Sequence, residues 1–186
     1  MSKRYQKRIM KEIKLLQKNQ NGNNDINFHY TVEFDETNMN VFKMNVSISN
    51  FYDKDKKPAE QLNIYKDLKK LKVKDITFEI HMDEYPIKPP FVRILKPMLT
   101  GGYIMSGGNI CMDLFGTKIW SAALTIENVM VMVVQLFKER DYVSLKKEDI
   151  NKEYDLATAQ KSHKHVIKGV HSNWNHDEDL INYKGM

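Results

Sequence analysis

Residues 101–120 read Gly-Gly-Tyr-Ile-Met-Ser-Gly-Gly-Asn-Ile-Cys-Met-Asp-Leu-Phe-Gly-Thr-Lys-Ile-Trp and contain the only cysteine of the chain, Cys111. A sole thiol cannot form a disulfide within the chain. The glycine pairs at 101–102 and 107–108 permit backbone conformations closed to other residues, as a loop needs when it presents a side chain. A structural cysteine buried beside a turn is the alternative, because free cysteine is among the most buried residue types. The motifs on either side of the loop favour a presented thiol.

Two further motifs flank this loop: Tyr-Pro-Ile-Lys-Pro-Pro at 85–90 and Trp-Ser-Ala-Ala-Leu-Thr-Ile at 120–126. Together the three stretches resemble the catalytic core of the ubiquitin-conjugating enzymes. That family's pattern is Tyr-Pro-x-x-Pro-Pro, then Gly-x-Ile-Cys-Leu-Asp, then Trp-Ser-Pro-Ala-Leu-Thr-Ile. The resemblance is closest to the Q-type subclass, through Gly-Gly-Tyr and Gly-Gly-x-x-Cys-Met around the cysteine and Tyr-Asp-Leu-Ala-Thr-Ala-Gln at 154–160. It covers nearly the whole chain.

The resemblance implies an α+β fold of the UBC type. Its parts are an N-terminal helix, a four-stranded antiparallel meander sheet, a long active-site loop, a central helix and a C-terminal helix. Residues 1–186 then form a single UBC-like catalytic domain, which suits the chain's length and its 41% hydrophobic composition. A charged insertion at 51–74, with a short helix around 61–71, is interpreted as a surface excursion or a partner-specific contact. Residues from about 171 to 186 form a C-terminal tail.

Hydrophobic periodicity predicts the same elements. Helical spacing predicts a first helix over about 3–18, with Ile9, Ile13 and Leu16 on one face. Strict alternation predicts strands near 28–34, 42–48 and 76–82, and residues 91–95 supply the last strand.

Two helices are predicted after the cysteine. The run 126–138 is apolar nearly all round, which indicates a buried helix, and Thr125 is its N-cap candidate. A final helix over about 150–170 places five residues on one face: Leu156, Ala159, His163, Val166 and Val170.

Charge and composition bear on the class of partner and on location. The net charge of +5 invites a nucleic-acid interpretation, but only four of the 29 basic residues are arginine and no nucleic-acid motif is present, so the balance argues against it. No segment approaches the roughly 18–20 apolar residues of a membrane span. A single thiol is typical of a reducing compartment, so the expected location is cytoplasmic or nuclear.

Four late histidines raise the question of a metal site: His163, His165, His171 and His176. The chain has no second cysteine and no His-Glu-x-x-His spacing. We therefore predict neither a metal nor a cofactor.

The resemblance implies a reaction and its partners. Cys111 would take the C-terminal glycine of ubiquitin, or of a ubiquitin-like protein, as a thioester from an activating enzyme. It would pass this acyl group to an amine of a protein substrate, with a ligase of the RING or HECT type. A non-catalytic UBC-like module that binds ubiquitin or a ligase is the alternative.

The resemblance also assigns contact residues. The basic first helix would dock on the activating enzyme through Lys7, Arg8 and Lys11. Ile87 and Ala122 lie where ligases touch these enzymes. Ala122 stands where the family usually has proline, which makes that loop less rigid.

The family's His-Pro-Asn is missing, because Gly-Gly-Tyr at 101–103 stands in its place. This departure is the chief argument for the non-catalytic alternative. Tyr103, through its hydroxyl, and Asn109 are candidates to support the oxyanion; otherwise they are a structural aromatic and a turn residue. Asp113 is the nearest acid that could orient or deprotonate the acceptor amine, and Asp141 is a second.

Overall fold

The computed structural model describes residues 3–22, 26–34, 37–101, 103–115, 119–139, 143–145 and 150–164, without the side chains of residues 3, 4 and 139. Several predicted features lie outside these ranges, namely Asp141, the tail at 171–186, the three last histidines, and Val166 and Val170 of the final helix.

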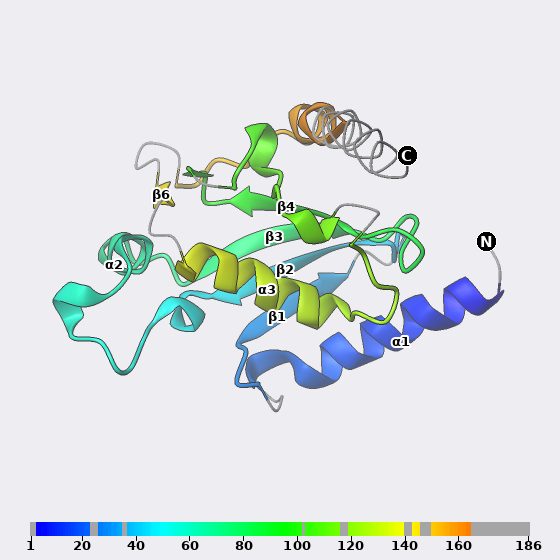
Figure 1. Ribbon diagram of the computed structural model, residues 1–186, viewed down its shortest axis with the longest axis horizontal. Helices are drawn as coiled ribbons and strands as arrows, with labels where there is room; N and C mark the ends of the chain where they lie inside the picture. The colour runs from blue at the N-terminus through cyan, green and yellow to red at the C-terminus, as the bar shows by residue number, and fades with distance from the viewer. Residues whose placement is uncertain are drawn as a thin grey trace, which may run out of the picture.

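A four-stranded antiparallel meander forms the centre of the molecule (Figure 1). Its strands, in spatial order, are β1 (Tyr30–Phe34), β2 (Val41–Ser47), β3 (Asp75–His81) and β4 (Phe91–Lys96). The register pairs Met44 with Phe78 and Phe78 with Ile94, so apolar side chains line one face across the sheet. The predicted alternation is confirmed.

Two helices lie against this sheet. Helix α1 (Lys3–Asn19) buries Ile9, Ile13 and Leu16, as predicted from their spacing. Helix α3 (Ile126–Glu139) lies across the apolar face of the sheet (Figure 1), and the Asn128 N–H donates to Thr125 Oγ1 at its start. The expectation that α3 is buried on every side is wrong, because Met132 is 42% exposed.

The insertion at 51–74 contributes to the core. Helix α2 (Asn63–Lys70) confirms the short helix expected there, and it buries Ile64 and Leu68. Phe51, which ends the 3-10 helix η2 (Ile48–Phe51), is fully buried against Phe137 of α3. The insertion is therefore more than a surface excursion, since three of its side chains extend the hydrophobic core.

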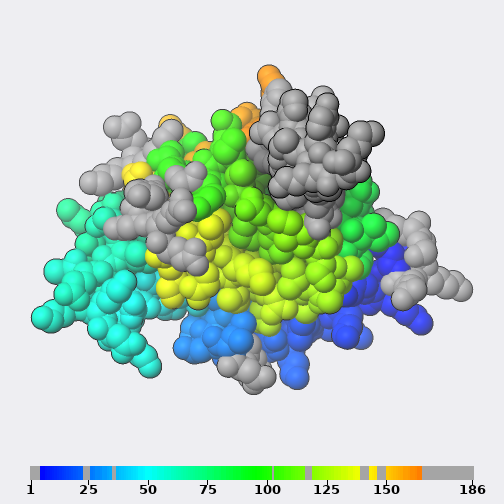
Figure 2. Space-filling view, in the orientation of Figure 1, coloured from blue at the N-terminus to red at the C-terminus, as the bar shows by residue number. Residues whose placement is uncertain are grey.

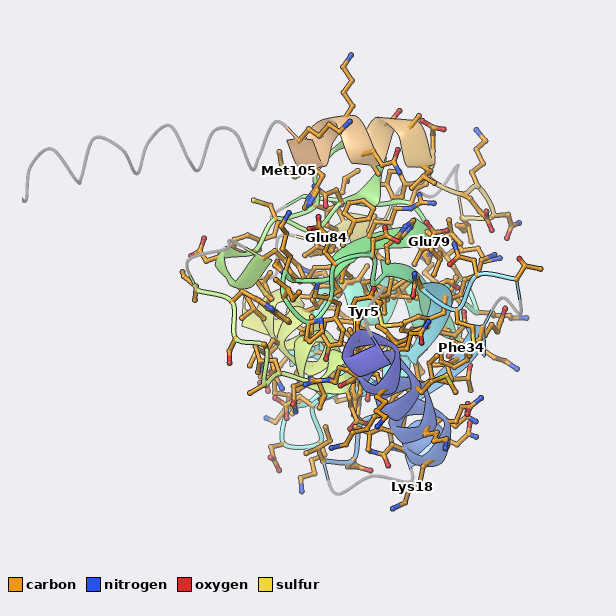
Figure 3. All side chains as sticks on the ribbon, turned by 90° about the vertical axis from the view of Figure 1, so that its right-hand side faces the viewer. Tyr5, Lys18, Phe34, Glu79, Glu84 and Met105 are labelled. Atoms are coloured by element: carbon orange, nitrogen blue, oxygen red, sulfur yellow. The ribbon has the colours of Figure 1, made fainter. Side chains whose placement is uncertain are left out.

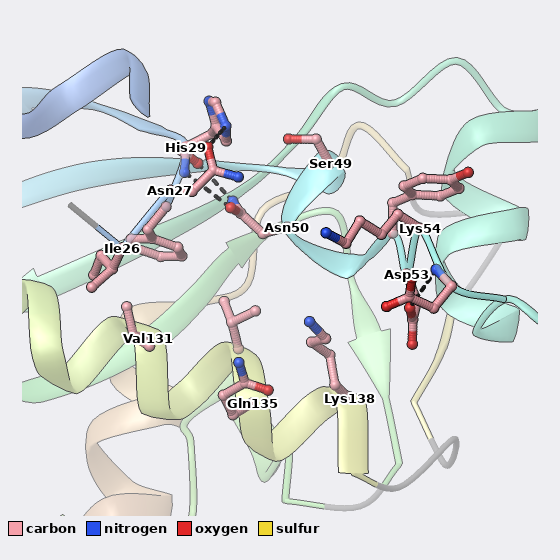
Figure 4. A pocket seen from close by; sticks show the side chains of 14 residues that line it. Ile26, Asn27, His29, Ser49, Asn50, Asp53, Lys54, Val131, Gln135 and Lys138 are labelled. Carbon is pink, nitrogen blue, oxygen red and sulfur yellow. Dashed lines mark hydrogen bonds between the residues drawn. The ribbon is translucent and has the colours of Figure 1, made fainter. Parts of the chain in front are cut away.

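A groove of about 480 Å³ separates part of this insertion from α3 (Figure 4). Its walls come from residues 26–29, from 49–55 and from the exposed side of α3 around Gln135. None of its lining residues belongs to the loop that carries Cys111.

The C-terminal segment lies beyond β4 (Figure 1). Within the described residues the helix runs over 156–164, whereas 150–155 form a turn and an extended stretch, so the expected start at 150 is too early. Ala159 is fully buried, and the ring of His163 packs edge-on against Phe91 with 4.8 Å between centroids. This helix is thus docked at the sheet edge next to the cysteine loop.

Candidate active site

Cys111 lies on an extended segment that runs beside β4. The Ile110 N–H donates to the Val92 carbonyl at 3.2 Å, which continues the sheet by one short strand. On its other side, this segment pairs antiparallel with residues 103–105, because Ile104 is opposite Ile110. The Cys111 N–H donates to the Tyr103 carbonyl and the Met105 N–H to the Asn109 carbonyl, each at 2.8 Å. The backbone that bears the thiol is therefore held from both sides.

This pairing decides which side chains share a face. In extended chains successive side chains alternate, and residues opposite each other point to the same side. Ile110 enters the core and is 2% exposed. Asn109 and Cys111 therefore lie on the other face, together with Tyr103 opposite Cys111. The structure brings three of the predicted site residues together.

Gly107 and Gly108 are required by both conformation and space. They have φ angles of +76° and +78°, which L side chains rarely adopt. A Cβ at Gly107 would lie 2.2 Å from the Ala159 nitrogen, and one at Gly108 would lie 2.3 Å from the Ile94 carbonyl oxygen and 2.7 Å from the Tyr154 ring. These glycines, which form 3-10 helix η4 (Ser106–Gly108) with Ser106, let the C-terminal segment pack directly on the loop.

The Cys111 thiol is half-buried and not sealed in the core. Burial raises the pKa of Cys111 above its ordinary value, and the negative charge of Asp113, which begins 3-10 helix η5 (Asp113–Phe115), raises that pKa further. The expectation of a thiol near its reference pKa is therefore wrong. At neutral pH this cysteine is protonated to a greater degree than a free one.

Asn109 is not the surface turn residue that its sequence context allowed. It is 1% exposed, and within the described structure neither its amide nitrogen nor its amide oxygen has a hydrogen-bond partner. A buried polar group left unpaired typically costs about 1–3 kcal/mol. Tyr103 is half-buried, and Asp113 is exposed beside the thiol.

Comparison with known proteins identifies the family. The family model described as "Ubiquitin-conjugating enzyme" matches residues 72–170, which is more than half of the chain. The chain belongs to the ubiquitin-conjugating enzyme family. Membership places it among transferases.

The curated relatives place this ubiquitin-conjugating enzyme in the Q subclass. Mouse and human "Ubiquitin-conjugating enzyme E2 Q1" are each 32% identical to it over 171 residues, which cover 87% of this chain and 36% of each relative. A mouse ubiquitin-conjugating enzyme protein of the Q-like type is 32% identical over 133 residues, covering 70% of this chain and 78% of that protein. The chain thus spans about a third of the length of the Q1 relatives and most of the Q-like one.

Solved structures bear on the fold alone. A ubiquitin-conjugating enzyme E2 from Plasmodium falciparum matches with a TM-score of 0.50 at 21% identity, covering 70% of this chain and 81% of that one. Human ubiquitin-conjugating enzyme E2 G1 matches with a TM-score of 0.50 at 12% identity, covering 71% and 93%. The expected UBC fold is confirmed.

The two expected ligase-contact positions of this conjugating enzyme lie on neighbouring loops. Ile87 is 80% exposed, and Ala122 is exposed in a β-turn closed by the Leu124 N–H to the Ser121 carbonyl. The Trp120 indole N–H donates to the Pro86 carbonyl at 2.7 Å and so joins the two loops. Loop 119–125 borders α3 on the face seen in Figure 2, where the surface is yellow-green.

Arg8 is placed differently from Lys7 and Lys11. The two lysines are exposed on α1, whereas the Arg8 guanidinium donates to the carbonyls of Ala122 and Leu124 at 2.9 and 2.8 Å. It also binds the carboxylate of Glu12, which is 2% exposed. Arg8 is thus a link between α1 and the 120–125 loop, as well as a part of the basic helix. An acid at i+4 from an arginine was the available signal.

Sequence reasoning missed a second buried arginine. Arg93 is 3% exposed; its Nε donates to Glu79 at 2.9 Å and its Nη1 to the Tyr154 carbonyl at 2.7 Å. Hydrogen bonds from His81 and then Arg93 lower the pKa of Glu79 to about 2. A lone arginine in the apolar strand 91–96 was the signal.

Two further findings concern metals and membranes. Within the described ranges, no group of three or more His, Cys, Asp and Glu side chains is arranged to hold a metal ion. No helix in those ranges combines the length and apolar character needed to span a membrane.

Proposed function

We propose that this protein accepts ubiquitin, or a ubiquitin-like protein, as a thioester on Cys111 and transfers it to an amine of a protein substrate with the help of a RING or HECT type ligase. One observation carries the proposal. The chain's only thiol is half-buried on a pinned extended segment of a ubiquitin-conjugating fold, next to two polar side chains and a carboxylate. Acyl transfer through a nucleophilic thiol is chemistry that such an arrangement can perform.

The reaction consists of two exchanges. In the first, Cys111 Sγ attacks the carbonyl carbon of the thioester on the activating enzyme; a new C–S bond forms, the old one breaks, and the Cys111 proton passes to the departing thiolate. In the second, an amine nitrogen attacks the Cys111 thioester, a C–N bond forms, and the amine proton returns to the Cys111 sulfur. ATP is consumed by the activating enzyme, since this chain contains no phosphate-binding glycine motif.

The raised pKa of Cys111 shapes both exchanges. A protonated thiol must lose its proton as it attacks, and a thiolate of raised pKa is a poorer leaving group when the amine attacks. The second exchange therefore benefits most from a donor that stabilises the oxyanion. Tyr103 and Asn109 are the two candidates on the face of Cys111, and Asp113 is the group that would orient the amine or take its proton.

The surface supports the proposed partners. Lys7 and Lys11 form the exposed basic side of α1, which suits an acidic surface on the activating enzyme. Ile87 and Ala122 form the surface proposed for the ligase. The absence of a nucleic-acid motif and the single thiol favour a cytoplasmic or nuclear protein that acts on proteins.

A charging assay tests the proposal. The protein is incubated with ubiquitin, activating enzyme and ATP, and the products are separated with and without reductant. We expect an adduct that reductant removes, that Cys111→Ala abolishes and that Cys111→Ser converts to a reductant-stable ester. With a well-folded protein and an activating enzyme that charges a known conjugating enzyme, no adduct would favour the non-catalytic module that binds ubiquitin or a ligase.

A further inference from the structure

Tyr154 contacts the loop that carries Cys111 on both sides. Its backbone N–H donates to the Leu95 carbonyl at 2.9 Å, and its hydroxyl donates to the Leu99 carbonyl, where the loop leaves the sheet. Its ring lies against Gly108, where a Cβ would come within 2.7 Å of Tyr154 Cδ2. One side chain therefore joins the entry of the loop to its exit, three residues before Cys111.

Tyr154 is itself anchored on the sheet. The buried Arg93 guanidinium donates to the Tyr154 carbonyl at 2.7 Å and is held in turn by Glu79 at 2.9 Å. After Tyr154, Asp155 caps the helix 156–164, since the Thr158 N–H donates to its carboxylate at 2.7 Å. Ala159 of that helix then fills the space above Gly107. Figure 3 shows the labelled Met105 directly beneath this helix, at the end of the molecule opposite Lys18.

The bracketed segment, 99–108, contains Tyr103, whose carbonyl holds the Cys111 N–H. Its conformation sets how the Tyr103 side chain stands relative to the thiol. A loop rich in glycine has many alternative conformations, and each tie to a fixed point reduces them. The tyrosine hydroxyl and ring supply two such ties.

We propose that Tyr154 is a positioning residue for acyl transfer at Cys111: its hydroxyl and ring close the loop between Leu99 and Gly108 and so fix the thiol and Tyr103 relative to each other. This inference rests on the proposed function. Tyr154 acts through the loop and touches no reacting atom. The Tyr-Asp-Leu-Ala-Thr-Ala-Gln motif thereby acquires a role, with its tyrosine and its second alanine as the two contacts on the glycine pair.

The test compares Tyr154→Phe with a matched control, Tyr30→Phe. Each removes one hydroxyl; that of Tyr30 donates to Glu127 at 2.8 Å, on the side of the sheet where α1 and α3 begin and end and away from the loop. Charged protein is discharged to free lysine in single turnovers over a range of lysine concentrations. We expect Tyr154→Phe to lower the maximum rate about five- to tenfold with the half-saturating lysine concentration unchanged. Tyr30→Phe should lower the melting temperature and leave the rate within about twofold of wild type.

Amide hydrogen exchange on the uncharged protein gives an independent reading. The Ile104, Gly108 and Cys111 amides, which are bonded within the loop, should exchange faster in Tyr154→Phe and at the wild-type rate in Tyr30→Phe. Unchanged discharge and exchange in Tyr154→Phe, or equal losses in both variants, would overturn the proposal. If the wild type does not charge, the proposed function fails, and unchanged or faster exchange still decides whether Tyr154 holds the loop.

Discussion

Replacing Gly107 with alanine should separate the C-terminal helix from the cysteine loop. Two costs add at this position. The φ of +76° costs an alanine roughly 1–2 kcal/mol. The new Cβ would lie 2.2 Å from the Ala159 nitrogen and ordinary contact begins at 3.4 Å, so the helix must retreat by about 1.2 Å. Such overpacking adds roughly 1–3 kcal/mol, which gives a loss of about 2–5 kcal/mol in the free energy of unfolding.

Gly22→Ala is the matched control for this prediction. Gly22 has nearly the same φ, +77°, but its Cβ would meet only the His29 ring, at 2.5 Å, and a side chain on the surface can rotate away. We expect a loss of about 1–2 kcal/mol from the φ angle alone. Urea unfolding of both variants, with single-turnover discharge measured alongside, makes the comparison. Equal destabilisation within about 0.5 kcal/mol, or full discharge activity in Gly107→Ala, would refute the reasoning.

Three further predictions concern the surface and the thiol. Arg8→Lys keeps the charge but cannot reach two carbonyls and a carboxylate at once, so it should lower the free energy of unfolding by about 2 kcal/mol in urea titrations; a change below about 0.5 kcal/mol would contradict this. Asp113→Asn removes a negative charge and lowers the pKa of Cys111, so the midpoint of its alkylation by iodoacetamide should move to lower pH; an unchanged midpoint would exclude the carboxylate as a cause. Reversing Lys7 and Lys11 to Glu should slow charging at low salt, with the difference shrinking as salt rises, while discharge of charged protein to free lysine stays unchanged; a defect that ignores salt would point away from charge steering.

Sequence patterns were sufficient for features that depend on near neighbours. The spacing of Ile9, Ile13 and Leu16 specifies a helix face, and the alternation through Phe42 and Phe78 specifies a half-buried sheet. The motif around Cys111 was sufficient to select the residues that the structure brings to one face. In each case the information lies within a few positions of the residue concerned.

Features that depend on tertiary pairing could not be predicted in this way. Arg8 lies in a run of lysines that are exposed, and only the fold brings Ala122, 114 positions away, within reach of its guanidinium. Ile64 and Leu68 have helical spacing in a charged segment, which describes a surface helix equally well until α2 is docked on the core. The contact of Gly107 with Ala159 spans about fifty residues, so the reason for a second glycine pair appears only in three dimensions.

The raised pKa of the single thiol has a consequence for survival under oxidative stress. Peroxide attacks thiolates, so a cysteine that stays protonated at neutral pH is oxidised slowly. A chain with one irreplaceable sulfur nucleophile and no second thiol nearby to resolve a sulfenic acid gains from that slowness. The same burial that makes Cys111 a hesitant nucleophile also makes it a durable one, and two chains that do become cross-linked by oxidation can be joined only through their active sites.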